Sequence, residues 1–141
     1  MERWIIYAII SMLFAGLTSV IAKFGMKGLN SDTALAIRTG VVFTIIFANA
    51  FTFKNALREI KDSPMNNIIF LAISGITTSV SWIFYYRAMK EGQVSYVASI
   101  DKASIVVTLL LSFVVLREPI TAKVLVGAGF ILIGMFILIW K

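Results

Sequence analysis

The chain contains no cysteine and no histidine. The missing cysteines exclude disulfide bonds and thiolate nucleophiles, and the missing histidines remove the commonest general base. Without either residue the usual zinc sites are excluded as well. Prolines number only two, and charged residues make up 14% of the chain, against about 25% in an ordinary soluble domain. We therefore expect no metal, no cofactor and no enzymatic active site.

What the chain has in abundance is apolar side chains. They make up 60% of its 141 residues, and the mean hydropathy is +0.94. A soluble domain of this length could not bury so much apolar surface, so a lipid bilayer must cover it. The 13 Lys and Arg residues outnumber the 7 Asp and Glu residues. They are dispersed singly between apolar runs, which argues against nucleic acid and favours contact with anionic lipid headgroups.

Charged and turn-forming residues divide the chain into five apolar segments. A helix needs about 20 residues to cross a bilayer core of about 30 Å, with a range of about 17 to 25. The segments that meet this requirement are 4–22, 33–53, 65–86, 94–116 and 122–140. The second includes Arg38 and the fourth includes Asp101 and Lys102. We expect an all-α integral membrane protein, a bundle of five transmembrane helices that forms a single domain over residues 1–141.

Several short motifs follow one another in the second half of the chain. They are 85–89 (YYRAM), 92–97 (GQVSYV), 117–121 (REPIT) and a last apolar segment that carries Gly127 and Gly134. Lys23 follows the first segment, and Arg38 comes early in the second. In this order and spacing the chain resembles the EamA family of the drug/metabolite transporter superfamily over essentially its whole length.

This resemblance implies one five-helix repeat, equivalent to one half of a ten-helix transporter that exports small metabolites. The chain departs from the common family pattern in its fourth segment. Many members have an apolar residue and a proline where this chain has Asp101 and Lys102. Substrate and coupling mode are therefore not carried over from the fused, ten-helix members.

Two of the apolar segments carry polar stripes. At 100° per residue, the stripe of segment 94–116 lies within an arc of about 80° and consists of Asp101, Ser104, Thr108 and Ser112. The stripe of segment 65–86 consists of Ser74, Thr77, Thr78, Ser81 and Tyr85. Polar stripes in lipid turn toward each other or toward water, which predicts a shared polar cavity. The alternative is that the hydroxyls bond to backbone carbonyls and only hold helices together.

Asp101 is the eighth residue of its segment, so it lies about 10 Å below the helix start. A carboxylate at that depth must pair, take up a proton or reach water. Neighbouring helical positions diverge by about 100°, so we do not expect Asp101 to contact Lys102. Lys23 and Arg38 are the alternative partners. The competing interpretation is a structural ion pair, with Lys102 extending toward the interface.

These considerations give one set of candidate substrate-binding or proton-binding residues: Asp101, Lys102, Lys23, Arg38, Ser81, Trp82, Tyr85, Ser104 and Thr108. Lys23 and Arg38 either anchor their helices at the interface or face the cavity. In the second case their positive charge would favour a substrate with a carboxylate or another anionic group.

The distribution of cations bears on orientation, which is set mainly by Lys and Arg in short loops. If the chain crosses the membrane five times, six Lys and Arg residues lie on the same side as the N-terminus: Arg3, Lys54, Arg58, Lys61, Arg117 and Lys123. Five lie on the other side, or six with Arg38: Lys23, Lys27, Arg87, Lys90 and Lys141. This near tie predicts insertion in both orientations and a homodimer of two oppositely inserted protomers, with a parallel dimer as the alternative. We expect this multi-pass protein in the inner cell membrane. Gly127 and Gly134 share one helix face and are the predicted dimer interface, with packing inside the protomer as the alternative.

Three functions remain open at this stage. The leading hypothesis is a secondary active transporter that exports a small metabolite or drug-like solute by proton-coupled alternating access. The alternatives are a flippase subunit for lipid-linked head groups and a non-transporting partner that supports the assembly of another membrane protein. Asp101 and the two polar stripes favour a solute pathway, because a scaffold needs no carboxylate inside the membrane.

Overall fold

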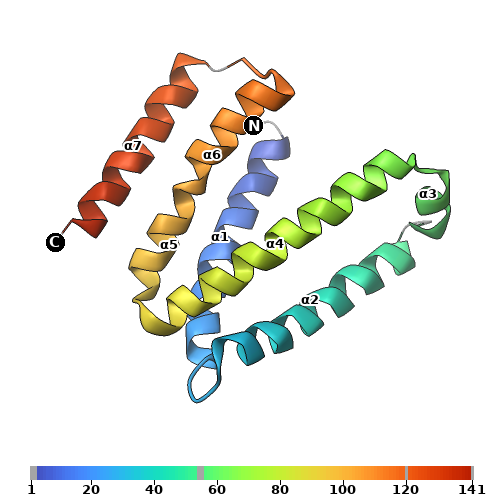
Figure 1. Ribbon diagram of the computed structural model, residues 1–141, viewed down its shortest axis with the longest axis horizontal. Helices are drawn as coiled ribbons and strands as arrows, with labels where there is room; N and C mark the ends of the chain where they lie inside the picture. The colour runs from blue at the N-terminus through green and yellow to red at the C-terminus, as the bar shows by residue number, and fades with distance from the viewer. Residues whose placement is uncertain (1–2, 54–55, 120, 141) are drawn as a thin grey trace. The chain divides into compact units, whose positions relative to one another are not determined.

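The computed structural model describes residues 3–53, 56–119 and 121–140 (Figure 1). Lys54 and Lys141, which entered the count of cations on the two sides, lie outside the described residues, as does Ile120 of the 117–121 motif. The helices are α1 Arg3–Gly25, α2 Ser31–Phe53, α3 Ala56–Asp62, α4 Met65–Glu91, α5 Val94–Lys102, α6 Ser104–Leu111, the π-helix η1 Ser112–Leu116 and α7 Ala122–Ile139.

Five helical segments within the described residues are long and apolar enough to cross a membrane. They are Arg3–Gly25, Ser31–Thr52, Met65–Glu91, Val94–Leu116 and Ala122–Ile139. The all-α architecture with five membrane-spanning segments is therefore confirmed. α1 and α4 are longer than their apolar runs, since α1 continues past Lys23 and α4 continues past Arg87 and Lys90.

The chain divides into two compact units, Met1–Lys90 and Glu91–Lys141. In the first unit, α1, α2 and α4 meet near the loop 26–30, where α1 has ended and α2 begins (Figure 1). The buried residues gather there and are Met26, Ser31, Leu35, Tyr86 and Met89. Gly28 turns this loop with a φ of 77°, a conformation in which glycine has no Cβ to clash.

Charged side chains form hydrogen bonds between the C-terminal part of α4 and the residues around the loop 26–30. Arg87 binds Asp32 through two hydrogen bonds, Nε to Oδ1 at 3.2 Å and Nη2 to Oδ2 at 3.0 Å. Lys90 donates to the carbonyls of Met26 and Leu29 at 3.1 and 2.7 Å. Lys23 in turn donates to the carbonyl of Met89. Each lysine thus supplies positive charge where a partner helix ends, which is where the helix dipole is negative.

In the second unit, α5 and α6 are followed by η1 and then by α7, which contacts α5. The backbone N–H of Arg117 donates to the carbonyl oxygen of Ser112 and completes the π-turn. The N–H of Glu118 donates to the same carbonyl at 3.2 Å. Arg117 has a φ of 56°, the left-handed conformation common where helices end. The Thr121 hydroxyl then caps α7 by accepting from the Val124 N–H at 3.4 Å.

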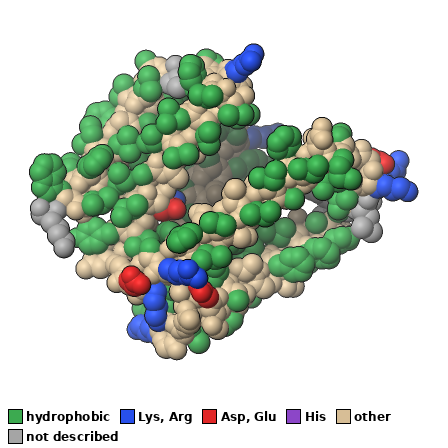
Figure 2. Space-filling model, in the orientation of Figure 1, with side chains coloured by type: hydrophobic (Ala, Val, Ile, Leu, Met, Phe, Trp, Pro, Cys, Tyr) green, Lys and Arg blue, Asp and Glu red, His purple; other side chains and the backbone are tan. Residues whose placement is uncertain are grey.

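The surface of each unit is mostly apolar (Figure 2). Large side chains such as Phe14, Leu71 and Phe130 are 65%, 73% and 71% exposed. A soluble protein rarely leaves a contiguous apolar surface of this kind exposed to water, whereas the hydrocarbon chains of a lipid bilayer solvate such a surface. The helices therefore present the surface that a multi-pass membrane protein requires.

Candidate functional site

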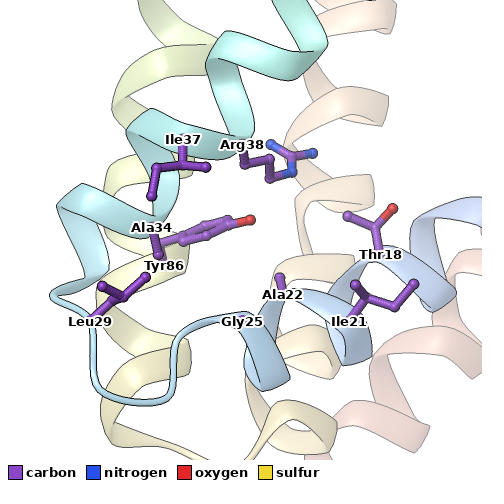
Figure 3. A pocket seen from close by; sticks show the side chains of 9 residues that line it. All are labelled: Thr18, Ile21, Ala22, Gly25, Leu29, Ala34, Ile37, Arg38 and Tyr86. Carbon is purple, nitrogen blue, oxygen red and sulfur yellow. The ribbon is translucent and has the colours of Figure 1, made fainter.

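A cavity of about 320 Å³ lies within the first unit, between α1, the loop 26–30, α2 and α4. Its wall is mainly apolar, and the residues that form it are Thr18, Ile21, Ala22, Gly25, Leu29, Ala34, Ile37, Arg38 and Tyr86. The Thr18 hydroxyl donates to the carbonyl of Phe14 in its own helix at 2.7 Å. The polar groups that remain for a ligand are those of Arg38 and Tyr86. Figure 3 shows the Arg38 guanidinium and the Tyr86 hydroxyl pointing into the space between α2 and α1.

Arg38 is held by aromatic rings of α4. Its Cζ lies 4.4 Å from the centre of the Trp82 ring and 5.8 Å from the centre of the Tyr86 ring. Trp82 and Tyr86 are four residues apart, so they share a face of α4, and together they flank one cation. Arg38 makes no ion pair with a described carboxylate. Its Nη1 is buried without a hydrogen-bond partner among the described residues.

Tyr86 is a functional candidate outside the predicted set of substrate-binding or proton-binding residues. Its side chain is 3% exposed, and its hydroxyl is buried with no hydrogen-bond partner in the described part of the chain. Tyr86 is one of three neighbouring aromatic residues in 84–86, and nothing in the letters distinguishes it from the other two. The one usable signal was its i+4 spacing from Trp82, which places both rings beside the same neighbour.

Tyr85 and Lys23, two predicted site residues, lie where α1 meets α4. The hydroxyls of Tyr85 and Ser19 are 2.9 Å apart and hydrogen-bonded. Lys23 lies one helical turn further along α1 and binds the Met89 carbonyl. Both side chains therefore join α1 to α4 in this structure, and neither lines the cavity. Their role in substrate or proton binding stays a prediction.

Asp101 and Lys102 lie in the second unit and contact each other. Lys102 Nζ is 3.5 Å from Asp101 Oδ2, and the two side chains are 65% and 40% exposed. The expectation that Asp101 does not contact Lys102 is therefore wrong. α5 ends at Lys102, and the long lysine side chain curls back to its neighbour.

The helix is interrupted directly after this pair. Ala103 separates α5 from α6 and has a ψ of −15°. The N–H of Ala103 donates to the carbonyl oxygen of Ile100 at 2.9 Å, and the carbonyl oxygen of Ala103 accepts from the N–H of Val106 at 3.0 Å. Bonds of this three-residue spacing tighten the turn, and such a stretch inside a long helix often marks a hinge. Broken membrane helices are also a recurring feature of transporter binding sites.

A family model for the EamA-like transporter family matches residues 2–140. The chain belongs to this family. The resemblance expected from the order of the motifs is thus confirmed, and the protein is a multi-pass membrane protein of a transporter family. A relative from Sinorhizobium sp, named as an uncharacterized transporter in the cobO 3' region, is 36% identical over 137 residues. That match covers 97% of this chain and 96% of the relative, so the two have nearly the same length. No solved structure matches the chain.

The polar stripes of this EamA-like chain largely bond to their own helices. Thr108 donates to the Ser104 carbonyl at 3.1 Å, and Thr77 and Thr78 donate to the Ser74 carbonyl at 2.9 and 2.8 Å. Ser81 and Ser104 are exposed on their helices. The stripes belong to separate units, so the shared cavity between the two segments stays a prediction.

The predicted dimer interface is an open surface of α7 within the described protomer. A Cβ added at Gly127 or at Gly134 would meet no atom within 4 Å outside the helix itself. The two glycines leave the helix backbone accessible to a neighbour, as small residues do at helix contacts in membranes. Their role in a dimer remains a prediction.

Proposed function

We propose that this protein is a secondary active transporter that exports a small metabolite or drug-like solute in exchange for protons, and that it works as a homodimer in the inner cell membrane. The observation that carries the proposal is the Asp101–Lys102 pair beside a break in a membrane-spanning segment. Membership of the EamA-like family supports the coarser part, transport across a membrane.

The coupling chemistry follows from this pair. When Asp101 is ionised, the Lys102 ammonium at 3.5 Å partly neutralises it. Uptake of a proton leaves a neutral carboxylic acid beside an ammonium without a counter-charge, and the lysine is then drawn toward water. Because the hydrogen-bond ladder is already interrupted at Ala103, α5 can change direction there at little cost. Proton binding and helix movement are linked in this way.

The Asp101→Asn variant tests the proposal, because it keeps the size of the side chain and removes its proton chemistry. Purified protein is first screened by thermal shift against amino acids, polyamines, quaternary amines and lipid precursors, and the stabilising solutes are then followed in proteoliposomes. We expect Asp101→Asn to lose transport driven by a pH gradient and to keep solute exchange without a gradient. Full gradient-driven transport by the variant would contradict a coupling role for Asp101.

Asp62→Asn is the matched control. Asp62 is an exposed carboxylate in α3, outside the membrane-spanning segments, and pairs with Arg58 at 3.7 Å. Its amide variant should transport like the wild type. Wild-type protein that binds and moves none of these solutes, and no short organic anion either, would instead favour the assembly-partner function.

A further inference from the structure

We infer that Arg38 and Tyr86 form a carboxylate-binding subsite, which makes the transported solute a small organic anion with an apolar side. This inference deepens the proposed function and rests on it. It comes from two buried polar atoms, Arg38 Nη1 and the Tyr86 hydroxyl oxygen, whose side chains point into one cavity and which have no hydrogen-bond partner among the described residues.

The first step concerns charge. The Arg38 guanidinium is always ionised, and it lies in a membrane-spanning segment without an acidic partner among the described residues. A buried charge of this kind is costly unless it is paired. Stacking over Trp82 compensates part of that cost through the ring face. The N–H groups of Nη1 are left without a hydrogen-bond partner among the described residues.

The second step concerns geometry. A guanidinium presents its N–H groups as a planar fork that matches the two oxygens of a carboxylate. The Tyr86 hydroxyl, which also has no described partner, can donate a further hydrogen bond to the same anion. Burial of both donors away from water strengthens these bonds and penalises a ligand that leaves them unmade.

The third step concerns the remainder of the ligand. The cavity of about 320 Å³ is at the lower end of the range for small-molecule sites. Beyond the two donors its wall is formed by aliphatic side chains such as Ile21, Leu29 and Ile37. These observations favour a short monocarboxylate with an aliphatic portion. Polyamines and quaternary amines are disfavoured, because they would bring a second cation beside Arg38.

The test uses purified full-length protein in lipid nanodiscs and three probes with the same tail: pentanoate, pentanamide and pentylamine. Binding is measured by calorimetry, with no gradient and no transport. We expect pentanoate to bind and the amide and amine not to bind. Arg38→Met should abolish binding, and Tyr86→Phe, which removes only the hydroxyl, should weaken it by about tenfold. Arg38→Lys, which keeps the charge and loses the fork, should also bind more weakly than the wild type.

Arg58→Met is the control, because it removes an exposed cation of α3 that lies outside the cavity. It should bind pentanoate as the wild type does. If Arg38→Met fails to fold, Tyr86→Phe alone decides, since its size and packing are almost unchanged. Equal binding of pentanoate and pentylamine, or unchanged binding in Tyr86→Phe, would overturn the subsite. If the Arg38 and Tyr86 variants change pentanoate binding only in nanodiscs that contain phosphatidylglycerol, the two donors bind a lipid phosphate. This result would also overturn the subsite.

This design separates the subsite from the transport proposal. Asp101→Asn should bind pentanoate normally, because Asp101 is not part of the cavity. Normal binding together with an absence of any transport would leave the subsite intact and refute the transporter. Proton-coupled transport of amines without pentanoate binding would do the reverse.

Discussion

Arg38 and Asp101 are both charged residues within membrane-spanning segments, but their surroundings differ. Arg38 lies over Trp82 and lines an apolar cavity, so an aromatic face stabilises its charge, and its Nη1 has no hydrogen-bond partner among the described residues. Asp101 is partly exposed and touches the ammonium of the next residue. The first arrangement supports the proposed anion subsite, and the second is the basis of the proposed coupling role of Asp101.

Arg117 gives a stability prediction at the same scale. Its backbone is left-handed, with a φ of 56°, which asparagine tolerates and β-branched residues do not. Arg117→Asn and Arg117→Val remove the same charge, so a comparison of the two isolates the backbone. We expect the valine variant to be less stable than the asparagine variant by about 1 kcal/mol, measured by unfolding in mixed detergent micelles. Equal stabilities would mean that the chain does not hold this conformation in the folded protein.

Part of the candidate site could be read from the sequence. Arg38 and Asp101 were conspicuous because charges are rare inside apolar segments, and Trp82 was noted beside them. The cavity itself was not predictable, because it depends on how α1, α2 and α4 converge around the loop 26–30. Tyr86 stood outside the predicted set for the same reason, because its burial is set by neighbours from other helices. The contact of Asp101 with Lys102 was not expected, because the angular separation of neighbouring helical positions leaves out the reach of a long lysine side chain at a helix end.

At the scale of elements, hydropathy and length were sufficient to predict the five spans, since a bilayer imposes both on any helix that crosses it. They were not sufficient for the details of segment 94–116. The structure divides it into α5, α6 and the π-helix η1, with a tight turn at Ala103. Alanine is the best helix former, so its identity gave no sign of an interruption. The break lies in the hydrogen-bond ladder, which composition does not determine.

The exposed glycine face of α7 leads to a prediction about association. Gly127→Leu and Gly134→Leu should fit the isolated protomer, since nothing lies within 4 Å of the added Cβ. If this face is the dimer interface, each leucine should shift the protein from dimer toward monomer in light scattering or energy-transfer measurements in detergent.

Gly129→Leu is the control for this experiment. Gly129 is equally open in the protomer but lies on a different face of α7. Its leucine variant should associate like the wild type. Unchanged association in all three variants would move the interface away from α7.

At the scale of the whole molecule, the balance of cations between the two sides predicts two orientations. The chain has no cysteine, so a single introduced thiol reports on its own position. Ser63→Cys is a suitable probe, because Ser63 is exposed between α3 and α4. In intact cells or sealed vesicles we expect about half of these thiols to react with a membrane-impermeant maleimide from each side. Reaction from one side only, in a preparation that is active in transport, would exclude dual insertion and favour a parallel dimer.

The contacts that join α1 and the loop 26–30 to α4 also determine when the first unit can assemble during synthesis. Ser19 meets Tyr85 and Lys23 meets Met89 across 66 residues, and Lys90 reaches Met26 across 64. When the first two spans leave the ribosome, the groups that will hold them do not yet exist. α1 and α2 therefore enter the bilayer before their contacts with α4 can form, with Arg38 not yet stacked on Trp82 and Tyr86. These contacts can form only after translation has passed residue 90, and a nascent chain halted before Trp82 would leave the Arg38 cation to lipid or to the insertion machinery.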